Sequence, residues 1–328
     1  MKFTIDDIKK IAILFDRDNL HFYISEYNLN SLRETVPGVE IVMAPNETEL
    51  LKKTTDADML MVWARNKPAT FVKNAPSLKW IHSLLAGYDH LRIPEILEGD
   101  FVITNTQGIH ANPISEYVLA HILFKLKSLN YMAKQQERVL WSKPWSDEVL
   151  GKTVAVLGVG NIGKEICRKC KLVGFNVIGY KRHYEEFEYV DELYTDPKDL
   201  NLMLSKADFV VDILPGSPST EHIIGKEQFM AMKKGCYFIN VGRGITVDHY
   251  ALVWALQNGM ISGCALDAID PEPLPASSPL WGFQNVLITP HMAADSPEYM
   301  NRAFAKINEN FERLKKGEDL KYVVDLKG

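Results

Sequence analysis

The sequence predicts an α/β protein with two doubly wound domains, each built on a parallel β-sheet. The chain has 328 residues, which is enough for two domains of ordinary size. Short apolar runs alternate with helix-like stretches along the whole chain, and strands separated by helices form right-handed βαβ units in parallel sheets. One apolar run leads directly into a glycine-rich turn, which is typical of a strand that passes tightly into a helix.

The composition narrows the class of protein. Hydrophobic residues make up 46% of the chain and charged residues 24%, as in ordinary globular proteins. The formal net charge of −5 excludes the overall basic excess of a nucleic-acid binder. No apolar run reaches the ~20 residues of a membrane span, and we expect no signal peptide. Four cysteines are too few for a disulfide scaffold, so we expect a protein of the reducing cytoplasm.

The first third of the chain contains five expected strands with helical stretches such as Glu47–Lys53 between them. The strands are Ile11–Phe15, Val39–Met43, Met59–Val62, Trp80–Ser83 and Phe101–Thr104. A long helix is expected next, with Asn112 as its N-cap and Pro113 in its first position. Its segment Ile114–Lys127 is apolar nearly all round, which is typical of a helix buried between two domains or between two subunits.

A second series of expected strands follows, and the chain then closes with a helix. The strands are Thr153–Leu157, Asn176–Tyr180, Phe209–Leu214, Cys236–Val241, Gly263–Asp267 and Val286–Thr289. Ser296 is the expected N-cap of the last helix, Pro297 its first residue and Gly317 its end. The expected domains are therefore residues 1–104 with 291–328, and residues 105–290.

The glycine-rich turn has the pattern G-x-G-x-x-G at Gly158, Gly160 and Gly163, between a strand and the helical stretch Lys164–Lys171. Gly158 permits the tight turn, Gly160 lets a pyrophosphate approach the backbone, and Gly163 lets the helix pack on the strand. Free N–H groups at the start of the helix bind the phosphates. The order of strand, turn and helix favours a dinucleotide site over an empty turn.

The end of the next strand indicates which dinucleotide to expect. An acidic residue about 20 residues after the glycines usually binds the adenosine ribose hydroxyls, but here Lys181 and Arg182 follow the strand. A carboxylate would repel a 2′-phosphate, whereas a guanidinium grips it, so we expect NADP in preference to NAD. Two alternatives stay open. In the first, Lys181 and Arg182 are solvated surface charges. In the second, Glu185 and Glu186 reach back to the ribose and restore the use of NAD.

Cys167 and Cys170 form a C-x-x-C pair on the helix after the glycines. No second pair accompanies them, so we expect two small residues that fill a helix face and no metal site.

Three residues near the carboxyl ends of the later strands form a chemical set, namely Arg243, Glu272 and His291. Ligands of open α/β sheets bind at this edge. An arginine can bind a carboxylate through two hydrogen bonds and polarise the adjacent carbonyl. A histidine can transfer a proton near neutrality, and a nearby glutamate favours the imidazolium. With a nicotinamide hydride donor, this set would reduce a 2-keto acid. Taken alone, Arg243 is also compatible with a surface ion pair, Glu272 with a solvated loop residue, and His291 with a buried core histidine.

Over nearly its whole length, the sequence resembles the D-isomer-specific 2-hydroxyacid dehydrogenases. The resemblance rests on four stretches, which are Leu150–Val154 with the glycine turn, Asn240–Gly244 with Val247-Asp248, Ala265–Asp267 with Glu272–Pro275, and Thr289–His291. It implies a Rossmann dinucleotide-binding domain at 105–290, a flavodoxin-like substrate domain, and a cleft that closes on its ligand. It also implies a homodimer that pairs through the cofactor domains.

The resemblance also implies roles for single residues. Arg243 would bind substrate, His291 would be the acid/base, and Glu272 would tune it. Ala86 and Gly87 lie in a turn, Leu85–Asp89, whose N–H groups would hold the substrate carboxylate. The implied cofactor contacts are Gly158, Gly160, Asn161, Ile162, Gly163, Lys181, Arg182, Leu214, Pro215, Thr220, Val241 and Asp267, the last toward the nicotinamide carboxamide. Candidates for walls of the substrate pocket are Tyr88, His110 and Trp141.

Lys181 stands where NAD-dependent members of the family carry an aspartate. The sequence is therefore similar to the NADP-using glyoxylate/hydroxypyruvate or 2-ketoacid reductases, although the motifs do not identify the keto acid. One alternative is an NAD-dependent D-2-hydroxyacid or phosphoglycerate-type dehydrogenase, and a related one is a dehydrogenase that oxidises phosphite. Another, from a different class, is a dinucleotide-sensing, corepressor-like binding protein, which the intact Arg243, Glu272 and His291 disfavour.

Overall fold

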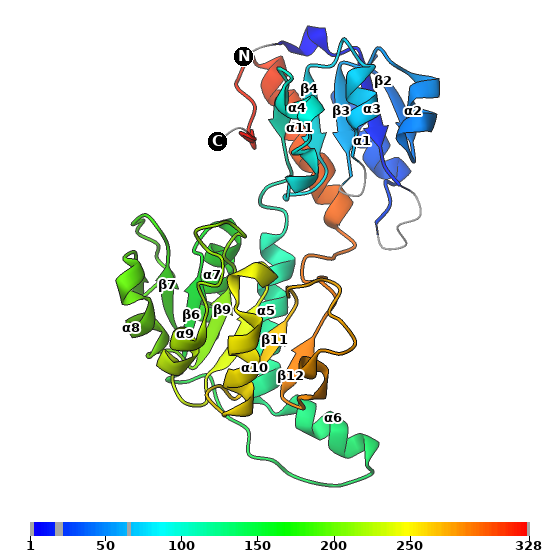
Figure 1. Ribbon diagram of the computed structural model, residues 1–328. Coiled ribbons are helices and arrows are strands. Elements are labelled where there is room, and N and C mark those ends of the chain that lie inside the picture. The colour runs from blue at the N-terminus through cyan, green and yellow to red at the C-terminus, as the bar shows by residue number, and fades with distance from the viewer. Residues whose placement is uncertain (1–2, 17–21, 64–66, 327–328) are drawn as a thin grey trace. The chain divides into compact units, whose positions relative to one another are not determined.

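The computed structural model describes residues 3–16, 22–63 and 67–326. The chain divides into two compact units (Figure 1). Unit 1 comprises Met1–Ile109 and Asp295–Gly328, and unit 2 comprises His110–Ala294. These boundaries lie a few residues beyond the expected 104/105 and 290/291, so His291 belongs to the same unit as Arg243 and Glu272.

Unit 1 contains, among its described residues, a five-stranded parallel sheet in the order β2-β1-β3-β4-β5. This is the flavodoxin strand order, as predicted. The strands are β1 Lys10–Leu14, β2 Glu40–Ala44, β3 Met59–Val62, β4 Trp80–Ser83 and β5 Val102–Thr104. Each of the expected strands of this unit is present. They could be predicted because short β-branched and aromatic runs bounded by polar residues are strong strand signals.

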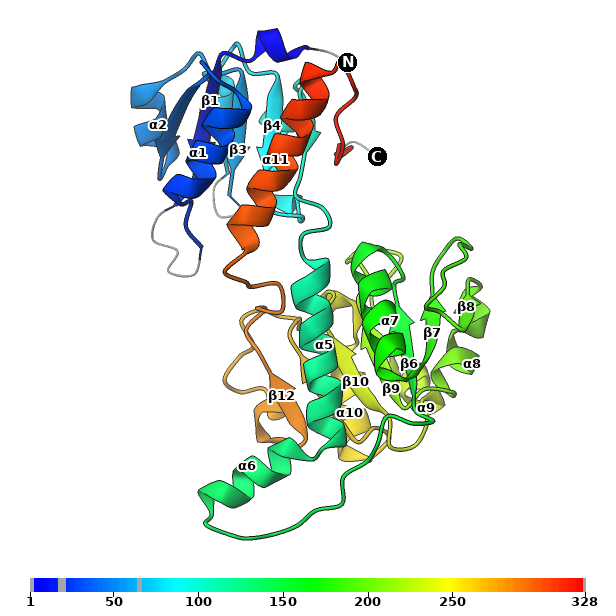
Figure 2. The same cartoon turned by 180° about the vertical axis from the view of Figure 1, so that it is seen from behind.

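Helices cover both faces of this sheet, and alternate residues of each strand meet opposite layers. Ile11 and Ile13 of β1 pack with α1 (Glu26–Thr35) and α11 (Tyr299–Lys315), which lie side by side in Figure 2. The opposite face packs against α2 Glu47–Lys53, α3 Ala69–Lys73 and α4 Pro94–Leu97. Single turns of 3₁₀ helix, Ile5–Asp7 and Asp89–Leu91, complete the unit.

The start of α11 differs from the prediction. Its N-cap is Glu298, and Ser296 forms a separate turn before it, with its Oγ accepting from the Glu298 N–H at 3.2 Å and its carbonyl accepting from the Tyr299 N–H at 3.0 Å. Ser296 thus satisfies amides that a cap would satisfy, but in a turn of its own. The expected stop is present, because Gly317 has a φ of 71° just beyond the last helical residue.

Unit 2 contains, in the described part of the chain, a seven-stranded parallel sheet in the order β12-β11-β10-β9-β6-β7-β8. The order reverses between β6 and β9, which is the Rossmann arrangement that the sequence predicts. The strands are β6 Thr153–Leu157, β7 Asn176–Tyr180, β8 Glu192–Tyr194, β9 Phe209–Asp212, β10 Tyr237–Asn240, β11 Gly263–Leu266 and β12 Val286–Ile288. The edge strand β8 is not predicted, because three residues without an apolar run give no strand signal.

Two helical layers sandwich the second sheet. One face packs on α5 Ala111–Leu126 and α7 Asn161–Val173, and the other on α8 Leu200–Leu204, α9 Lys226–Ala231 and α10 His249–Gln257. Helix α6 Leu129–Glu137 follows α5, and three 3₁₀ turns, Pro197–Asp199, Gly244–Thr246 and Pro279–Gly282, join the rest. Cys167 and Cys170 are free and buried on α7, as expected for space-filling residues.

Helix α5 begins earlier than predicted. His110 is its N-cap, although the His110 side chain does not cap the helix, so Asn112 is not the N-cap. The Asn112 Oδ1 instead accepts from Lys169 Nζ of α7 at 2.7 Å. Pro113 is tolerated in the first turn, where its missing N–H would have no helical partner. The apolar stripe of Ile114, Val118 and Ile122 packs within unit 2, in the same cluster as α7.

Candidate active site

The glycine turn lies at the point where the strand order of unit 2 reverses. Gly158 has a φ of 105°, and a Cβ there would lie 2.9 Å from the Ile213 carbonyl oxygen of the neighbouring β9 loop. A Cβ on Gly163 would lie 2.1 Å from the Gly158 oxygen, so α7 touches the turn. By contrast, nothing lies within 4 Å of a Cβ built on the exposed Gly160. The N-terminus of α7 therefore has the bare backbone and open space that a pyrophosphate needs.

The β9 loop beside this turn is held by its own hydrogen bonds. Thr220 Oγ1 donates to the Pro215 carbonyl at 2.6 Å and accepts from the Ser217 N–H at 3.0 Å. Leu214 is buried at the base of the loop, as is Val241 at the end of the adjacent β10. Asn161 and Ile162 begin α7. The expected cofactor residues from α7, the β9 loop and β10 thus follow neighbouring strands at one sheet edge.

The basic residues after β7 are not both free. Lys181 Nζ pairs with Glu185, which also pairs with Lys164 Nζ of α7, whereas Arg182 is exposed. The two lysines hold the pKa of Glu185 down at about 2. Glu185 thus reaches back toward the glycine turn, but its carboxylate contacts lysines there.

His291 and Glu272 form a direct pair. The His291 Nδ1 lies 2.8 Å from Glu272 Oε2, while Glu272 Oε1 accepts from the Ile269 N–H at 3.0 Å. Both side chains remain partly exposed, at 50% and 38%. His291 has a φ of 52°, a left-handed conformation that is uncommon outside glycine and often marks functional sites.

Asp267 holds the loop that carries His291. Its carboxylate accepts from the Met292 N–H at 2.9 Å, from the Ala293 N–H at 2.8 Å and from Thr289 Oγ1 at 2.7 Å. Tyr117 of α5 contacts the same Thr289 hydroxyl, and burial raises the Tyr117 pKa to about 12. Asp267 is thus largely committed to positioning this loop, and its contact with a nicotinamide stays a prediction.

Arg243 follows β10, and its backbone is fixed from two sides. Its carbonyl accepts from Asn240 Nδ2 at 3.1 Å and from Thr246 Oγ1 at 2.6 Å. Thr246 Oγ1 also lies 2.5 Å from Asp212 Oδ2, and the Leu214 N–H donates to Asp212 Oδ1 at 3.0 Å. Complete burial raises the pKa of Asp212 to about 6. This network ties the β9 loop to the Arg243 backbone.

The loops that carry Arg243, Glu272 and His291 follow β10, β11 and β12, which are adjacent in the sheet. A Cβ on Gly244 would lie 2.0 Å from the backbone carbon of Ile269, so the arginine loop is in contact with the loop that ends at Glu272. The loops that carry the predicted set are therefore neighbours at one sheet edge of unit 2, while the joint action of the three side chains stays a prediction. Among the described residues, no cluster of three metal-binding side chains was found.

In unit 1, the predicted carboxylate-binding turn follows β4. Four successive carbonyls, at Leu84–Gly87, accept hydrogen bonds, in turn from Tyr299 Oη (3.1 Å), the Thr106 N–H (3.3 Å), Asn105 Nδ2 (2.7 Å) and Ser83 Oγ (3.3 Å). Among the described residues, the N–H groups of Ala86 and Gly87 donate to no protein acceptor. These amides are therefore available to an anion.

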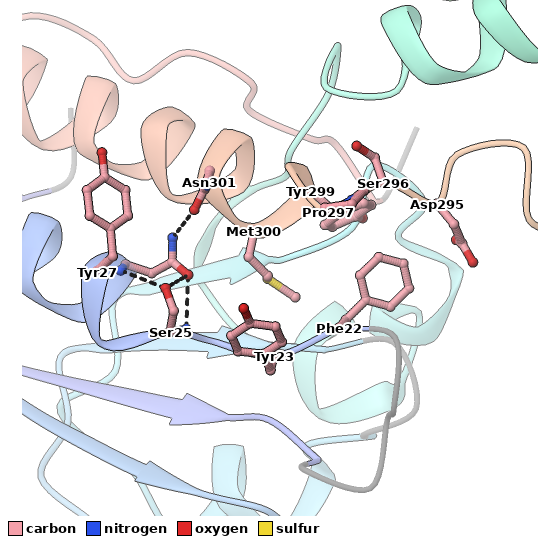
Figure 3. A pocket seen from close by; sticks show the side chains of 11 residues that line it. Phe22, Tyr23, Ser25, Tyr27, Asp295, Ser296, Pro297, Tyr299, Met300 and Asn301 are labelled. Atoms are coloured by element: carbon pink, nitrogen blue, oxygen red, sulfur yellow. Dashed lines mark hydrogen bonds between the residues drawn. The ribbon is translucent and has the colours of Figure 1, made fainter.

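Tyr299 also lines a cavity of about 580 Å³ between the starts of α1 and α11 (Figure 3). Phe22, Tyr23 and Met300 contribute apolar walls. Asn28 also lines the cavity, and its Nδ2 donates to Asn301 Oδ1 at 2.8 Å. The cavity and the carboxylate turn thus share one buried side chain.

The three candidates for pocket walls lie in different settings. Burial, with a smaller contribution from the Arg243 guanidinium, lowers the pKa of His110 to about 4. Tyr88 lies under the Arg92 guanidinium in unit 1, 5.9 Å from ring centre to cation. Trp141 is fully exposed on the segment after α6.

Sequence reasoning missed the residues that position the candidate loops, namely Tyr117, Asp212 and Thr246 in unit 2 and Tyr299 beside the turn of unit 1. Only Asp212 carries a visible signal, since it is an acid inside the otherwise apolar run Phe209–Leu214. A buried acid must find hydrogen-bond partners, and it therefore marks a network.

Comparison with known proteins identifies the family of the chain. Residues 119–293 match the family model described as D-isomer specific 2-hydroxyacid dehydrogenase, NAD binding domain. A glyoxylate reductase from Thermofilum pendens is 32% identical over 283 residues, which are 84% of this chain and 83% of the relative.

Two solved structures share the fold over nearly the full chain. A D-isomer specific 2-hydroxyacid dehydrogenase family protein from Aeromonas salmonicida has a TM-score of 0.84 and 31% identity, covering 97% of this chain and 99% of that one. An NADPH-dependent glyoxylate/hydroxypyruvate reductase from Sinorhizobium meliloti, in complex with NADP and sulfate, has a TM-score of 0.81 and 28% identity, covering 97% and 98%. The chain therefore belongs to the D-isomer specific 2-hydroxyacid dehydrogenase family and is an oxidoreductase with an NAD-binding Rossmann domain.

Proposed function

We propose that this enzyme reduces a small 2-keto acid, such as glyoxylate or hydroxypyruvate, to the D-2-hydroxy acid with NADPH. The observation that carries the proposal is the His291–Glu272 pair, 2.8 Å apart, on loops that adjoin the Arg243 loop. The reductase from Sinorhizobium meliloti and the glyoxylate reductase from Thermofilum pendens support the substrate class.

The residues divide the work by their chemistry. When bound, the nicotinamide supplies the hydride to the carbonyl carbon. Glu272 engages Nδ1 of His291, so Nε2 is the ring nitrogen that gives its proton to the carbonyl oxygen. Arg243 binds the carboxylate and polarises the carbonyl. In unit 1, the N–H groups of Ala86 and Gly87 are a second predicted binding group for a carboxylate.

The preference for NADPH is supported by the residues after β7. Lys181 and Arg182 follow the end of the strand, and the exposed Arg182 is accessible to a phosphate. Of the two acids that could otherwise serve a ribose, Glu185 and Glu186, Glu185 pairs with lysines through both of its oxygens. The structure of the relative from Sinorhizobium meliloti contains NADP.

We also propose that the protein is a homodimer that pairs through unit 2. The segment after α6 exposes Val139, Leu140, Trp141 and Trp145, at 91%, 55%, 105% and 99%. Val139, Leu140 and Trp141, together with residues of α6, border a groove of about 770 Å³. Contiguous apolar surface of this kind typically marks an interface.

A cytoplasmic location belongs to the same proposal, and it is supported by the four cysteines, which are all described and free. No helix in the described part of the chain has both the length and the apolar character needed to span a bilayer.

A matrix of two cofactors against several keto acids tests the function. The loss of NADPH or NADH absorbance measures the rate of each reaction. We expect the largest kcat/KM for NADPH with glyoxylate or hydroxypyruvate. H291A should lower kcat by roughly 10²-fold or more while the Kd for NADPH stays unchanged. Binding of NADPH without turnover of any keto acid would instead identify a dinucleotide-sensing protein, and turnover with NADH alone would overturn the cofactor assignment.

A further inference from the structure

Glu185 bridges two lysines from different elements. One carboxylate oxygen pairs with Lys164 Nζ on the first turns of α7, and the other pairs with Lys181 Nζ immediately after β7. Both lysines are largely covered, at 30% and 26% exposure, and Lys164 also lies over the Phe187 ring, 5.3 Å from its centre. The two cations are therefore gathered around one anion.

This cluster adjoins the glycine turn. The N–H groups of Gly158 and Val159 donate to the carbonyl of Tyr180, at 2.9 and 3.2 Å, and Lys181 is the next residue. Lys164 directly follows Gly163, the last glycine of the turn. In Rossmann folds the adenosine ribose binds at the end of the second strand, beside this turn. The anion between the lysines thus lies in the region where a 2′-phosphate would be placed.

We propose that Glu185 is a specificity-determining residue that occupies, from within the chain, the anion position that the 2′-phosphate of NADPH takes when it binds. The inference rests on the proposed use of NADPH. The phosphate must displace the carboxylate from Lys164 and Lys181, and Glu185 then turns to solvent. NADH has no 2′-phosphate and leaves the lysine–glutamate cluster intact.

The exchange is favourable because a phosphate has more charge and more acceptor oxygens than a carboxylate. Breaking the internal pairs nevertheless costs affinity. Two partly exposed ion pairs are each worth little, so we expect the neutral variant E185Q to bind NADPH roughly three- to tenfold more tightly. Binding of NADH should be unchanged.

Dissociation constants for NADPH, NADH and adenosine 2′,5′-bisphosphate test the proposal in the full-length protein. The matched control is E186Q, which removes the same charge at the neighbouring exposed position. We expect E185Q to tighten both 2′-phosphorylated ligands, E186Q to change little, and K181Q to weaken both. The double variant E185Q/K181Q should lose most of the gain, because the phosphate then has one lysine fewer to bind. Thermal unfolding would verify that each variant is folded.

Two results would overturn the inference. In the first, E185Q weakens NADH, which would make Glu185 a ribose ligand. In the second, E185Q leaves the 2′-phosphorylated ligands unchanged or tightens them no more than E186Q does. If neither wild type nor E185Q binds NADPH but NADH still supports keto-acid reduction, the NADPH assignment fails and this inference fails with it, whereas the reductase reaction stands.

Discussion

Replacing Asp212 by asparagine should stabilise the protein at neutral pH, although it removes a charge. The Thr246 hydroxyl lies between two oxygens, Asp212 Oδ2 at 2.5 Å and the Arg243 carbonyl at 2.6 Å. One hydroxyl has one proton to donate, so the second contact requires a proton from the other side. A protonated Asp212 supplies it, which fits the rise of its pKa from an ordinary 3.8 to about 6 by burial.

The magnitude follows from this pKa. The folded protein retains a proton on Asp212 between about pH 4 and pH 6, where the unfolded chain has released it. The free energy of unfolding therefore falls as the pH rises through this range, by about 3 kcal/mol in total for a pKa that folding raises from 3.8 to about 6. Asparagine reproduces the acid form, because its amide oxygen can accept from the Leu214 N–H and its amino group can donate to Thr246. D212N should lack this pH-dependent loss.

Urea denaturation of wild type and D212N between pH 4.5 and 7.5 measures the effect as a difference between two curves. We expect the free energies of unfolding to be similar at the acid end and D212N to be more stable by up to ~3 kcal/mol at pH 7.5. D248N, at the N-cap of α10 where asparagine caps as well as aspartate, controls for the substitution itself. Parallel curves for wild type and D212N would show that Asp212 does not take up its proton in the fold, and the reasoning would be wrong.

Three further outcomes follow from the contacts around the site. Y299F removes the hydrogen bond to the Leu84 carbonyl and should raise KM for the keto acid roughly threefold to tenfold, with a smaller change in kcat; an unchanged KM would mean that the turn needs no support from this hydroxyl. G163A places a methyl group 2.1 Å from the Gly158 oxygen and should abolish measurable NADPH binding in a calorimetric titration, unless α7 can shift without cost. W141E introduces a charge on the exposed apolar segment and should convert the dimer to a monomer in sedimentation velocity; a dimer of unchanged stability would place the interface elsewhere.

Much of the fold could be predicted because buried parallel strands have a clear sequence signal. Strands such as Met59–Val62 and Thr153–Leu157 are buried on both faces, and they appear in the sequence as short uninterrupted apolar runs. The ends of helices were harder to predict. Ser296 and Asn112 have side chains that can cap a helix, but each accepts a hydrogen bond in another setting. Ser296 Oγ accepts from the Glu298 N–H in a separate turn, and Asn112 Oδ1 accepts from Lys169 Nζ, which sequence spacing does not reveal.

The candidate site divides in the same way between visible and hidden residues. Arg243, Glu272 and His291 could be found because each follows a recognisable strand, and the sheet then brings the three loops to one edge. For Glu185, the sequence leaves open only whether it reaches back to the ribose, and the lysine contacts that the structure shows are not predicted. Its pairing with Lys164 depends on how α7 and β7 pack, which local sequence does not specify.

Asp212 shows why the positioning residues are the hardest to recognise and why they matter. A fully buried carboxyl is costly unless its oxygens are bonded, and the strand would be more stable with an apolar residue if packing alone were required. The acid instead links the Leu214 amide, in the β9 loop, to Thr246 and through it to the Arg243 carbonyl. This linkage makes the loop expected to touch the cofactor and the loop expected to bind the substrate parts of one hydrogen-bonded unit. D212L should therefore raise KM for the keto acid and the Kd for NADPH together, whereas a purely structural acid would change stability alone.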